Sequence, residues 1–265
     1  MADFSRIAEH YEKTSVVQRS ASDELIELLQ IKETDDVLDL ACGTGHSTRK
    51  IREITRGRVV GIDSAGGMIK RAKELCGNCR IDFRTCKAEQ MPFVEEFDVV
   101  FCNSAFQWFN PPGPVLKMCY RALREGGRAG IQAPARKTYS PNLVKAIEQV
   151  QIDGRTRDIF AHFRSPWFFL ERSEEYKSLF ESFGFRVLYS RIKKVASYHA
   201  PEEVYDIFDS GASAGYLDPR NYDVPLTEEF KMSFEKIVRG AFEKQADESG
   251  RVELVFYRIY LVAEK

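Results

Sequence analysis

The stretch VLDLACGTGHST, residues 37–48, places an apolar run directly before a glycine turn. Its first four residues have the pattern of a buried strand, and the residues from Ser47 onward have that of a helix. Gly43 and Gly45 permit positive φ and carry no side chain, so a ligand can lie against the backbone where this helix begins. The free N–H groups and the dipole at a helix start favour a carboxylate or a phosphate. The stretch therefore predicts a ligand site at the carboxyl end of the first strand of an α/β fold.

The spacing around this turn limits which ligand fits. A dinucleotide fingerprint needs a third small residue three positions after Gly45, where this chain has the β-branched Thr48. No Gly-Lys-Ser/Thr follows, so a Walker-type phosphate loop is also absent. The next strand ends in Asp63, which can accept both hydroxyls of a ribose or can cap the helix that follows it. These features suit a ligand with a ribose and an amino-acid end but no pyrophosphate.

Composition narrows the class of partner. The 265 residues suffice for one domain with insertions, and 39 basic against 40 acidic side chains give a formal net charge of −1. We therefore expect a small-molecule substrate, and neither nucleic acid nor a membrane as partner. No apolar segment approaches the roughly 20 residues that span a bilayer, and the first residues lack the apolar stretch of a secretory signal. These observations predict a cytoplasmic protein.

The six cysteines are expected to be thiols in a reducing compartment. Cys76, Cys79 and Cys86 could supply three soft metal ligands or a redox pair. A structural zinc site takes four ligands, and no fourth cysteine or histidine follows at a suitable spacing. We therefore expect no metal site.

Short β-branched runs alternate with amphipathic helices between residues 36 and 133, which is typical of a parallel sheet covered on both faces. The predicted strands are 36–40, 58–62, 81–84, 98–102 and 128–133, and the predicted helices are 47–56, 67–75 and 114–123. A helix over 174–183 precedes a late alternating strand that starts at Phe185, and the C-terminal segment VELVFYRIYLVAEK alternates as well. These two late strands are expected to pair as an antiparallel hairpin at the edge of the sheet. The segment between them predicts helices over 201–208 and 227–244.

Five segments together resemble the class I S-adenosylmethionine-dependent methyltransferases. In chain order they are VLDLACGTG, GIDSAGGMIKRAKE, CKAEQMPF, FDVVFCNSAFQWF and LREGGRAGIQAP. The resemblance implies a Rossmann-like, doubly wound α/β sheet of seven strands whose last strand is antiparallel, within a single domain over 1–265. It also implies an N-terminal helical lid over 1–30 and helical substrate-cap insertions over 135–183 and 199–247.

The same resemblance implies S-adenosyl-L-methionine as cofactor and S-adenosyl-L-homocysteine as product. Asp39, Ala41, Gly43 and Gly45 would line its methionine end, and Asp63 would take the ribose hydroxyls. The adenine would lie near Ser64, Met68 and Ala88, and the carbonyl of Asn103 would contact the methionine side. Lys87 stands where the third motif usually has an acidic residue, so a carboxylate contact to the adenine amino group is missing or comes from Glu89.

Within this superfamily the chain most resembles the malonyl-acyl-carrier-protein O-methyltransferases of biotin biosynthesis and the trans-aconitate methyltransferases. The segments that carry this likeness are FSRIAEHYEKTSVVQRSASDELIELL, NSAFQWF and GRVELVFYRIYLVAEK. The implied acceptor is a carboxylate of a small or acyl-carrier-bound acid. A carboxylate is ionised at neutral pH, so its methylation needs in-line positioning and a dry site but no general base.

Four residues are candidates for the acceptor site. Tyr11 folds over the cofactor, by the resemblance, or packs on the first helix. Trp108 forms a wall of the acceptor pocket or belongs to the core beneath the lid, and Gln107 is a polar contact. Arg136, after the fifth strand, is the favoured carboxylate anchor, since its planar fork pairs bidentately with a carboxylate. Arg19 and Arg164 are secondary choices for that anchor.

Two other classes of function stay open on sequence grounds. A carbon acid, phenol or amine acceptor would need a general base, for which His10, His162 or Tyr11 would be the place to look. A cofactor-binding module without catalysis would keep the motifs but turn over no acid.

Overall fold

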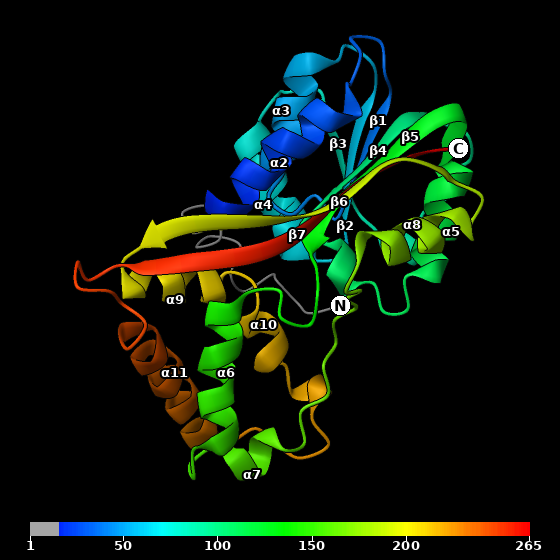
Figure 1. The fold of residues 1–265 in the computed structure, drawn as a ribbon. Coiled ribbons are helices and arrows are strands. Elements are labelled where there is room, and N and C mark those ends of the chain that lie inside the picture. The colour runs from blue at the N-terminus through cyan, green and yellow to red at the C-terminus, as the bar shows by residue number, and fades with distance from the viewer. Residues whose placement is uncertain (1–15) are drawn as a thin grey trace.

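The computed structural model describes the chain from residue 16 to residue 265, and its side chains from residue 21 onward. Seven strands form one sheet in the order β3-β2-β1-β4-β5-β7-β6 (Figure 1). The strands are β1 Val37–Leu40, β2 Val59–Asp63, β3 Asp82–Thr85, β4 Phe97–Asn103, β5 Leu123–Pro134, β6 Arg186–His199 and β7 Val252–Glu264. Strands β1 to β5 pair in parallel, and β7 pairs antiparallel with both β5 and β6. The predicted sheet and its antiparallel C-terminal hairpin are confirmed.

Helices cover both faces of this sheet, because successive side chains of a buried strand point to opposite faces and both are apolar. On one face lie α2 Val16–Leu29, α3 His46–Ile54 and α4 Gly66–Cys76 (Figure 1). On the other lie α5 Gly113–Ala122 and α8 Ser173–Glu181. Short 3-10 turns follow two of the strands, η2 Ala88–Gln90 after β3 and η3 Phe106–Trp108 after β4.

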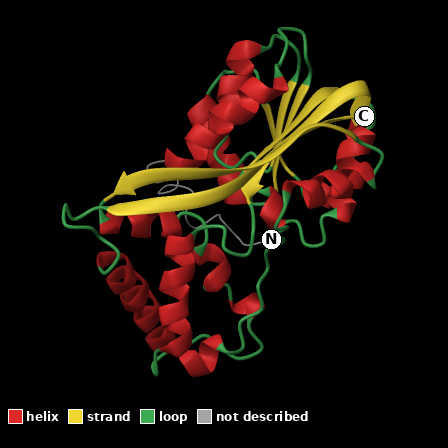
Figure 2. Cartoon of the chain, viewed as in Figure 1, coloured by secondary structure: helices red, strands yellow, loops and turns green. Residues whose placement is uncertain are grey.

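A second group of helices packs away from the main sheet and is called the cap below. It comprises α6 Pro141–Ile152, α7 Arg157–Phe160, α9 Pro201–Asp209, α10 Ser213–Tyr216 and α11 Glu228–Glu243, with the turn η4 Pro219–Asn221. Figure 2 shows these helices grouped below the long hairpin. They enclose their own apolar core, rich in aromatic rings. Two of the expected insertions, 135–183 and 199–247, contribute to this cap.

The cap is carried by the part of the hairpin that extends beyond the parallel strands. Strand β5 pairs with β7 only as far as Pro134 opposite Arg258, whereas β6 follows β7 to its first residue, Val252. The apolar side chains of Val252, Leu254 and Phe256 on this extension belong to the cap core. Asn142 of α6 accepts the Val255 N–H at 3.0 Å, which fixes α6 to the same extension.

One part of the expected 135–183 insertion lies elsewhere. Tyr176 and Phe180 of α8 are 1 % and 0 % exposed in the core of the main sheet, not in the cap. The cap segment therefore ends before α8, because the apolar stripe of α8 faces β6 and its neighbours.

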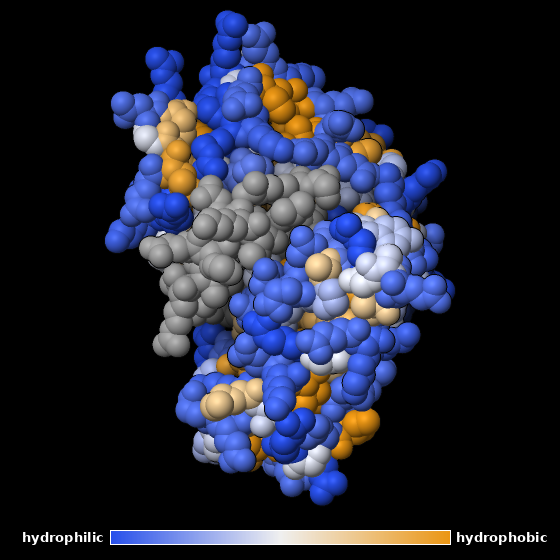
Figure 3. Space-filling model, turned by 90° about the vertical axis from the view of Figure 1, so that its left-hand side faces the viewer, coloured by the Kyte–Doolittle hydropathy of each residue, from blue (hydrophilic) through white to orange (hydrophobic). Residues whose placement is uncertain are grey.

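The surface offers no large apolar face in the view of Figure 3, where apolar side chains lie in separate small patches on a mostly hydrophilic surface. None of the helices described, from residue 16 on, combines the length and hydropathy needed to cross a membrane.

Candidate active site

The turn after β1 adopts the backbone conformation that its glycines predict. Ala41, Gly43 and Gly45 have φ of +58°, +56° and +76°. A Cβ on Gly45 would lie 2.6 Å from the ring of Phe83, so no larger residue fits there without displacement. A Cβ on Gly43 would meet nothing within 4 Å, so this glycine faces open space. The turn thus combines a tightly packed glycine with one whose exposed backbone can receive a ligand.

Asp63, at the end of β2, is tied to this turn. Its Oδ2 accepts the Gly43 N–H at 3.0 Å, and its Oδ1 accepts the N–H of Ala65, the residue that caps α4, at 2.8 Å. The side chain is 9 % exposed, and burial raises the pKa of its carboxyl above the ordinary value. Asp63 thus accepts backbone N–H groups from the turn after β1 and from the residue that begins α4, without itself being the N-cap of that helix.

Asp39 on β1 is buried beneath the turn and has a partner that the sequence did not reveal. The hydroxyl of Thr48 in α3 donates to Asp39 Oδ2 at 2.6 Å, and both residues are at most 2 % exposed. Burial raises the pKa of Asp39 to about 7, although the Thr48 hydrogen bond opposes this shift. Thr48, considered above only as an obstacle to a dinucleotide, in fact joins the first strand to its helix.

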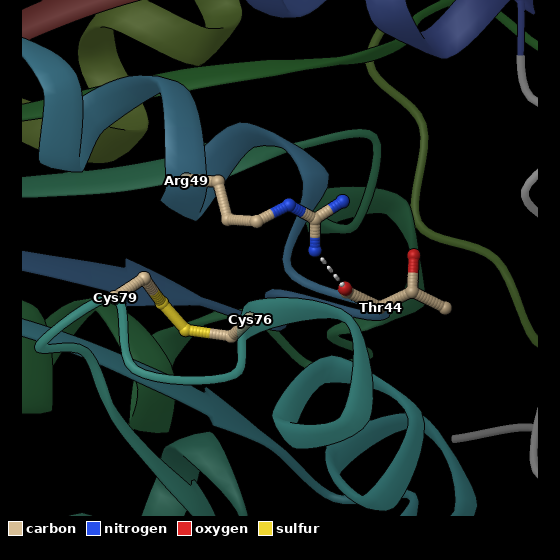
Figure 4. The surroundings of a disulfide bond; sticks show 4 residues. All are labelled: Thr44, Arg49, Cys76 and Cys79. Atoms are coloured by element: carbon tan, nitrogen blue, oxygen red, sulfur yellow. Dashed lines mark hydrogen bonds between the residues drawn. A yellow bond between two sulfur atoms is a disulfide. The ribbon is translucent and has the colours of Figure 1, made fainter.

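A further hydrogen bond to the turn comes from Arg49, whose Nη1 donates to the Thr44 carbonyl at 3.0 Å (Figure 4). Figure 4 also shows a disulfide between Cys76, at the end of α4, and Cys79. Their Cα atoms are 5.4 Å apart. The expectation that all six cysteines are thiols is therefore wrong for this pair, because the turn after α4 brings the two side chains together. Cys86 is a free thiol.

The structure brings the predicted cofactor residues to one edge of the sheet. The strands β3, β2, β1 and β4 are neighbours and run in parallel, so their carboxyl ends lie side by side. Residues at or just after these ends are Asp39, Ala41, Gly43, Gly45, Asp63, Ser64, Ala88, Glu89 and Asn103. Met68 lies one turn into α4 and is 2 % exposed, whereas the side chain of Glu89 is exposed.

A cavity of about 100 Å³ adjoins this edge between the sheet and the cap. Ser104 and Gln107, after β4, and Gln132, near the end of β5, line it from the sheet side. Five aromatic rings contribute to the rest of the wall, from Trp108, Tyr139, Trp167, Phe169 and Phe256. Among the residues that the structure describes, the lining includes no carboxylate and no imidazole. This arrangement can hold a small polar group in a dry, aromatic surrounding.

Two of the four predicted acceptor residues line this cavity. The ring of Trp108 lies 5.6 Å from that of Trp167, centroid to centroid, and forms part of the wall. Gln107 donates from Nε2 to the Ser104 carbonyl at 2.9 Å, while its buried Oε1 has no hydrogen-bond partner among the described residues. Tyr11 lies outside the described residues, so its predicted position is not tested.

Arg136 is not among the lining residues. Its guanidinium stacks on the ring of Tyr257 at 4.5 Å from the centroid. Tyr257 precedes Arg258 on β7, and adjacent strand residues point to opposite faces. Arg258, not Arg136, lines the cavity, and it is 4 % exposed. The sequence did carry a signal for Arg258, a single basic residue within the apolar run of β7, but the sequence alone gave no means of placing it at this cavity.

The remaining candidates lie elsewhere or outside the described part. His162 and Arg164 both contact Asp223, at 2.6 Å and 2.9 Å, and all three are exposed on the outside of the cap. His10 precedes the described residues, and the side chain of Arg19 is not described. The structure therefore brings neither His162 nor Arg164 to the cavity.

Comparisons with known proteins agree with this geometry. Residues 37–127 match the family model of a methyltransferase domain. The uncharacterized methyltransferase C70.08c of Schizosaccharomyces pombe is 32% identical over 190 residues, which are 69% of this chain and 71% of that protein. The chain belongs to the class I S-adenosylmethionine-dependent methyltransferases. It is accordingly an enzyme, and S-adenosylmethionine is its cofactor.

Two further likenesses mark the range of this methyltransferase family. A malonyl-[acyl-carrier protein] O-methyltransferase of Acetivibrio thermocellus is 29% identical over 140 residues, which cover 52% of this chain and 50% of that relative. The chain thus matches about half the length of this relative. A solved phosphoethanolamine N-methyltransferase of Haemonchus contortus, in complex with S-adenosylmethionine, shares the fold at a TM-score of 0.54 and 16% identity. The match covers 93% of this chain and 52% of that one.

Proposed function

We propose that this methyltransferase transfers the methyl group of S-adenosylmethionine to a carboxylate oxygen of a small or carrier-bound acid. The observation that carries the proposal is the chemistry of the cavity beside β4, to which the described residues contribute aromatic walls, neutral polar groups and one cation. An acid acceptor is already ionised at neutral pH, so it needs no base in such a lining. A phenol or amine acceptor would need one. The named malonyl carrier-protein relative supports the same class of acceptor.

The residues of the strand ends suit the cofactor that the family uses. Gly43 offers open space and positive φ on the ligand side of the turn, and Asp63 lies within hydrogen-bond distance of its N–H. We assign Asp39, Ala41, Gly43 and Gly45 to the methionine end and Asp63 to the ribose. Ser64, Met68, Ala88 and Glu89 are assigned to the adenine, and Asn103 to the methionine side.

When bound, the cofactor supplies an electrophilic methyl group on a sulfonium. The side chains of the cavity then have three tasks: to orient one acid oxygen in line with the S–CH₃ bond, to exclude water and to leave that oxygen its lone pair. Gln107 and Trp108, in the turn after β4, line the cavity and are assigned to this positioning. The bound sulfonium would supply this methyl group to the oxygen, and its sulfur would keep the bonding electron pair. Both charges disappear in the step, which a dry aromatic site favours.

The test is the identity of the methylated atom. Enzyme and methyl-labelled S-adenosylmethionine are incubated separately with malonyl carrier protein, with free trans-aconitate and with the amide analogues of both acids. We expect label in a base-labile methyl ester of at least one acid, one S-adenosylhomocysteine per ester, and no label in any amide. S-adenosylhomocysteine formed only with amines or phenols would contradict the proposal, as would cofactor binding with no turnover of any acid.

A further inference from the structure

Arg258 is a cation buried in the wall of the acceptor cavity. It lies in an apolar strand, is 4 % exposed, and contributes to the lining beside Gln132 and Phe256. Burial lowers the pKa of its guanidinium, which is the direction expected where surrounding groups compensate the charge incompletely. A buried charge is costly unless a partner neutralises it, so its presence in a ligand cavity needs an explanation.

From residue 21 onward, where side chains are described, the groups around Arg258 do not supply a dedicated anion. Its guanidinium lies 5.3 Å from the ring centroid of Phe256, and Tyr260 on the same face of β7 is its hydrogen-bonding neighbour. The acid whose charge acts on Arg258 is Glu24 of α2, which is bonded to Lys193 Nζ and reaches Arg258 only through the hydroxyl of Tyr260. In the part of the chain that the structure describes, Arg258 forms no ion pair with a carboxylate within 4.0 Å.

The neighbouring polar groups of the cavity are held in place by one another. Ser104 Oγ donates to Gln132 Oε1 at 2.9 Å, and Gln107 Nε2 donates to the Ser104 carbonyl at 2.9 Å. These neutral groups can orient a ligand but cannot balance a positive charge. The cavity therefore offers a fixed polar floor, aromatic walls and one unbalanced guanidinium, whose fork matches a carboxylate bidentately.

Charge balance shows that the anion bound by Arg258 differs from the carboxylate that is methylated. On the proposed function, the charge of the methylated carboxylate disappears together with that of the sulfonium. The charge of Arg258 persists, so its counter-anion must persist through the step as well. Arg258 lies on β7, two strands from β4, and two strand spacings are about 10 Å. A group held by Arg258 is thus set to one side of the strand end where methyl transfer is placed.

We propose that Arg258 binds a second carboxylate of the acceptor, one that is not methylated, and so selects acids with at least two carboxylates. This inference rests on the proposed function and narrows it, because a malonyl thioester carries only one carboxylate. Arg258 is then the specificity residue of the site, and the free di- or tricarboxylic acid is the favoured form of the substrate.

The experiment compares paired acceptors. Values of kcat/KM are measured for malonate, succinate and glutarate, for the monoamide of each, for trans-aconitate, and for malonyl carrier protein. The enzymes are wild type, Arg258→Gln, Arg258→Lys and Arg136→Gln. The last is the matched control, because Arg136 stacks on Tyr257 and so lies against the opposite face of β7. The affinity of each variant for S-adenosylhomocysteine and its denaturation midpoint show whether it is folded.

For wild type we expect at least one polyacid to exceed its monoamide by tenfold or more. Arg258→Gln should lower kcat/KM for that acid at least tenfold and leave the monoamide within twofold. Arg136→Gln should preserve the preference, and Arg258→Lys, which keeps the charge but loses the fork, should retain part of it. KM and kcat are also determined separately, and we expect the lower kcat/KM of Arg258→Gln to come from a higher KM.

Three results would overturn the inference while leaving the proposed function intact. They are equal wild-type kcat/KM for polyacid and monoamide, equal losses on both in Arg258→Gln, and a kcat/KM for malonyl carrier protein at least as high as for any polyacid. The wild-type comparison decides the matter even if both Arg258 variants fail to fold. Absence of turnover with every acid, despite cofactor binding, would instead contradict the proposed function itself.

Discussion

Gly43 and Gly45 occupy the same turn but have different surroundings, and alanine substitutions distinguish their roles. Gly45→Ala forces a methyl group to 2.6 Å from the Phe83 ring at a φ of +76°. We expect a loss of unfolding free energy on the order of 3 kcal/mol, since left-handed strain and overpacking add. Gly43→Ala meets open space, so only the strain of about 1 kcal/mol remains.

The same pair distinguishes packing from ligand contact. The added methyl group of Gly43→Ala points to the side where the cofactor is placed, so this variant should lose more cofactor affinity than stability. Urea unfolding and calorimetric titration with S-adenosylhomocysteine measure the two quantities. A Gly43→Ala enzyme with unchanged affinity would contradict the assignment of this turn to the methionine end.

Asp39 makes a prediction about pH. Its pKa is raised to about 7 in the folded chain, so between roughly pH 4 and pH 7 the folded state holds a proton that the unfolded state has released. Folding stability must therefore fall as pH rises through this window, by an amount on the order of a few kcal/mol. Asp39→Asn removes the titration while keeping an acceptor for the Thr48 hydroxyl.

The measurement is urea unfolding of both proteins without cofactor at pH 5 and pH 8. We expect the variant to gain stability over wild type between these two values, because the charged form of Asp39 exists only in wild type. A constant difference across the range would show that the carboxyl is not perturbed in the folded protein.

At this scale the sequence was informative where a residue acts through its own backbone or position. The glycines and Asp63 were predictable, since positive φ and the end of a strand are local properties. Thr48 and Arg258 were not, because their roles depend on Asp39 across the strand–helix contact and on a cavity shared by β4, β5 and β7. The disulfide was not predicted for the same reason: the spacing of Cys76 and Cys79 permits a redox pair, but it does not decide between that pair and free thiols.

Among the elements, α11 offers a clean test of the cap. Thr227 caps this helix, and its Oγ1 accepts the Phe230 N–H at 3.1 Å. Thr227→Ala should lower the free energy of unfolding by about 1 kcal/mol, and Thr227→Ser should restore most of it. Cofactor affinity should stay within twofold in both, since α11 packs on α6 and α9 and not on the strand ends. A large loss of cofactor affinity would show that the cap is coupled to the cofactor edge.

The elements of the sheet were predictable to within a few residues, whereas those of the cap were only partly so. Helix α6 was not assigned, although Pro141 at its start and Leu143, Ile147 and Val150 along its buried side give a helical period. The expected boundary at residue 183 also merged α8 with the cap. Amphipathic stripes show that a helix buries one face, but not which of two cores receives it.

The whole molecule has two main cores, that of the sheet and that of the cap, which share one hairpin. The parallel strands place the cofactor residues on one edge, and the extension of β6 and β7 carries the cap over that edge (Figure 1). The cavity lies where the two meet, so it includes residues from 104 to 258. No single sequence segment could reveal it, because its wall forms only when the cap docks on the extension.

The most direct measurement is a crystal structure of the enzyme with S-adenosylhomocysteine and succinate. The account predicts that the ribose hydroxyls bond to Asp63 and that the sulfur faces the cavity at Gln107 and Trp108, with one carboxylate of succinate near the sulfur. The other carboxylate should lie on Arg258. An amino-acid end of S-adenosylhomocysteine that lies away from residues 43–45, or a sulfur that faces away from this cavity, would contradict the assignment of the cofactor and acceptor sites.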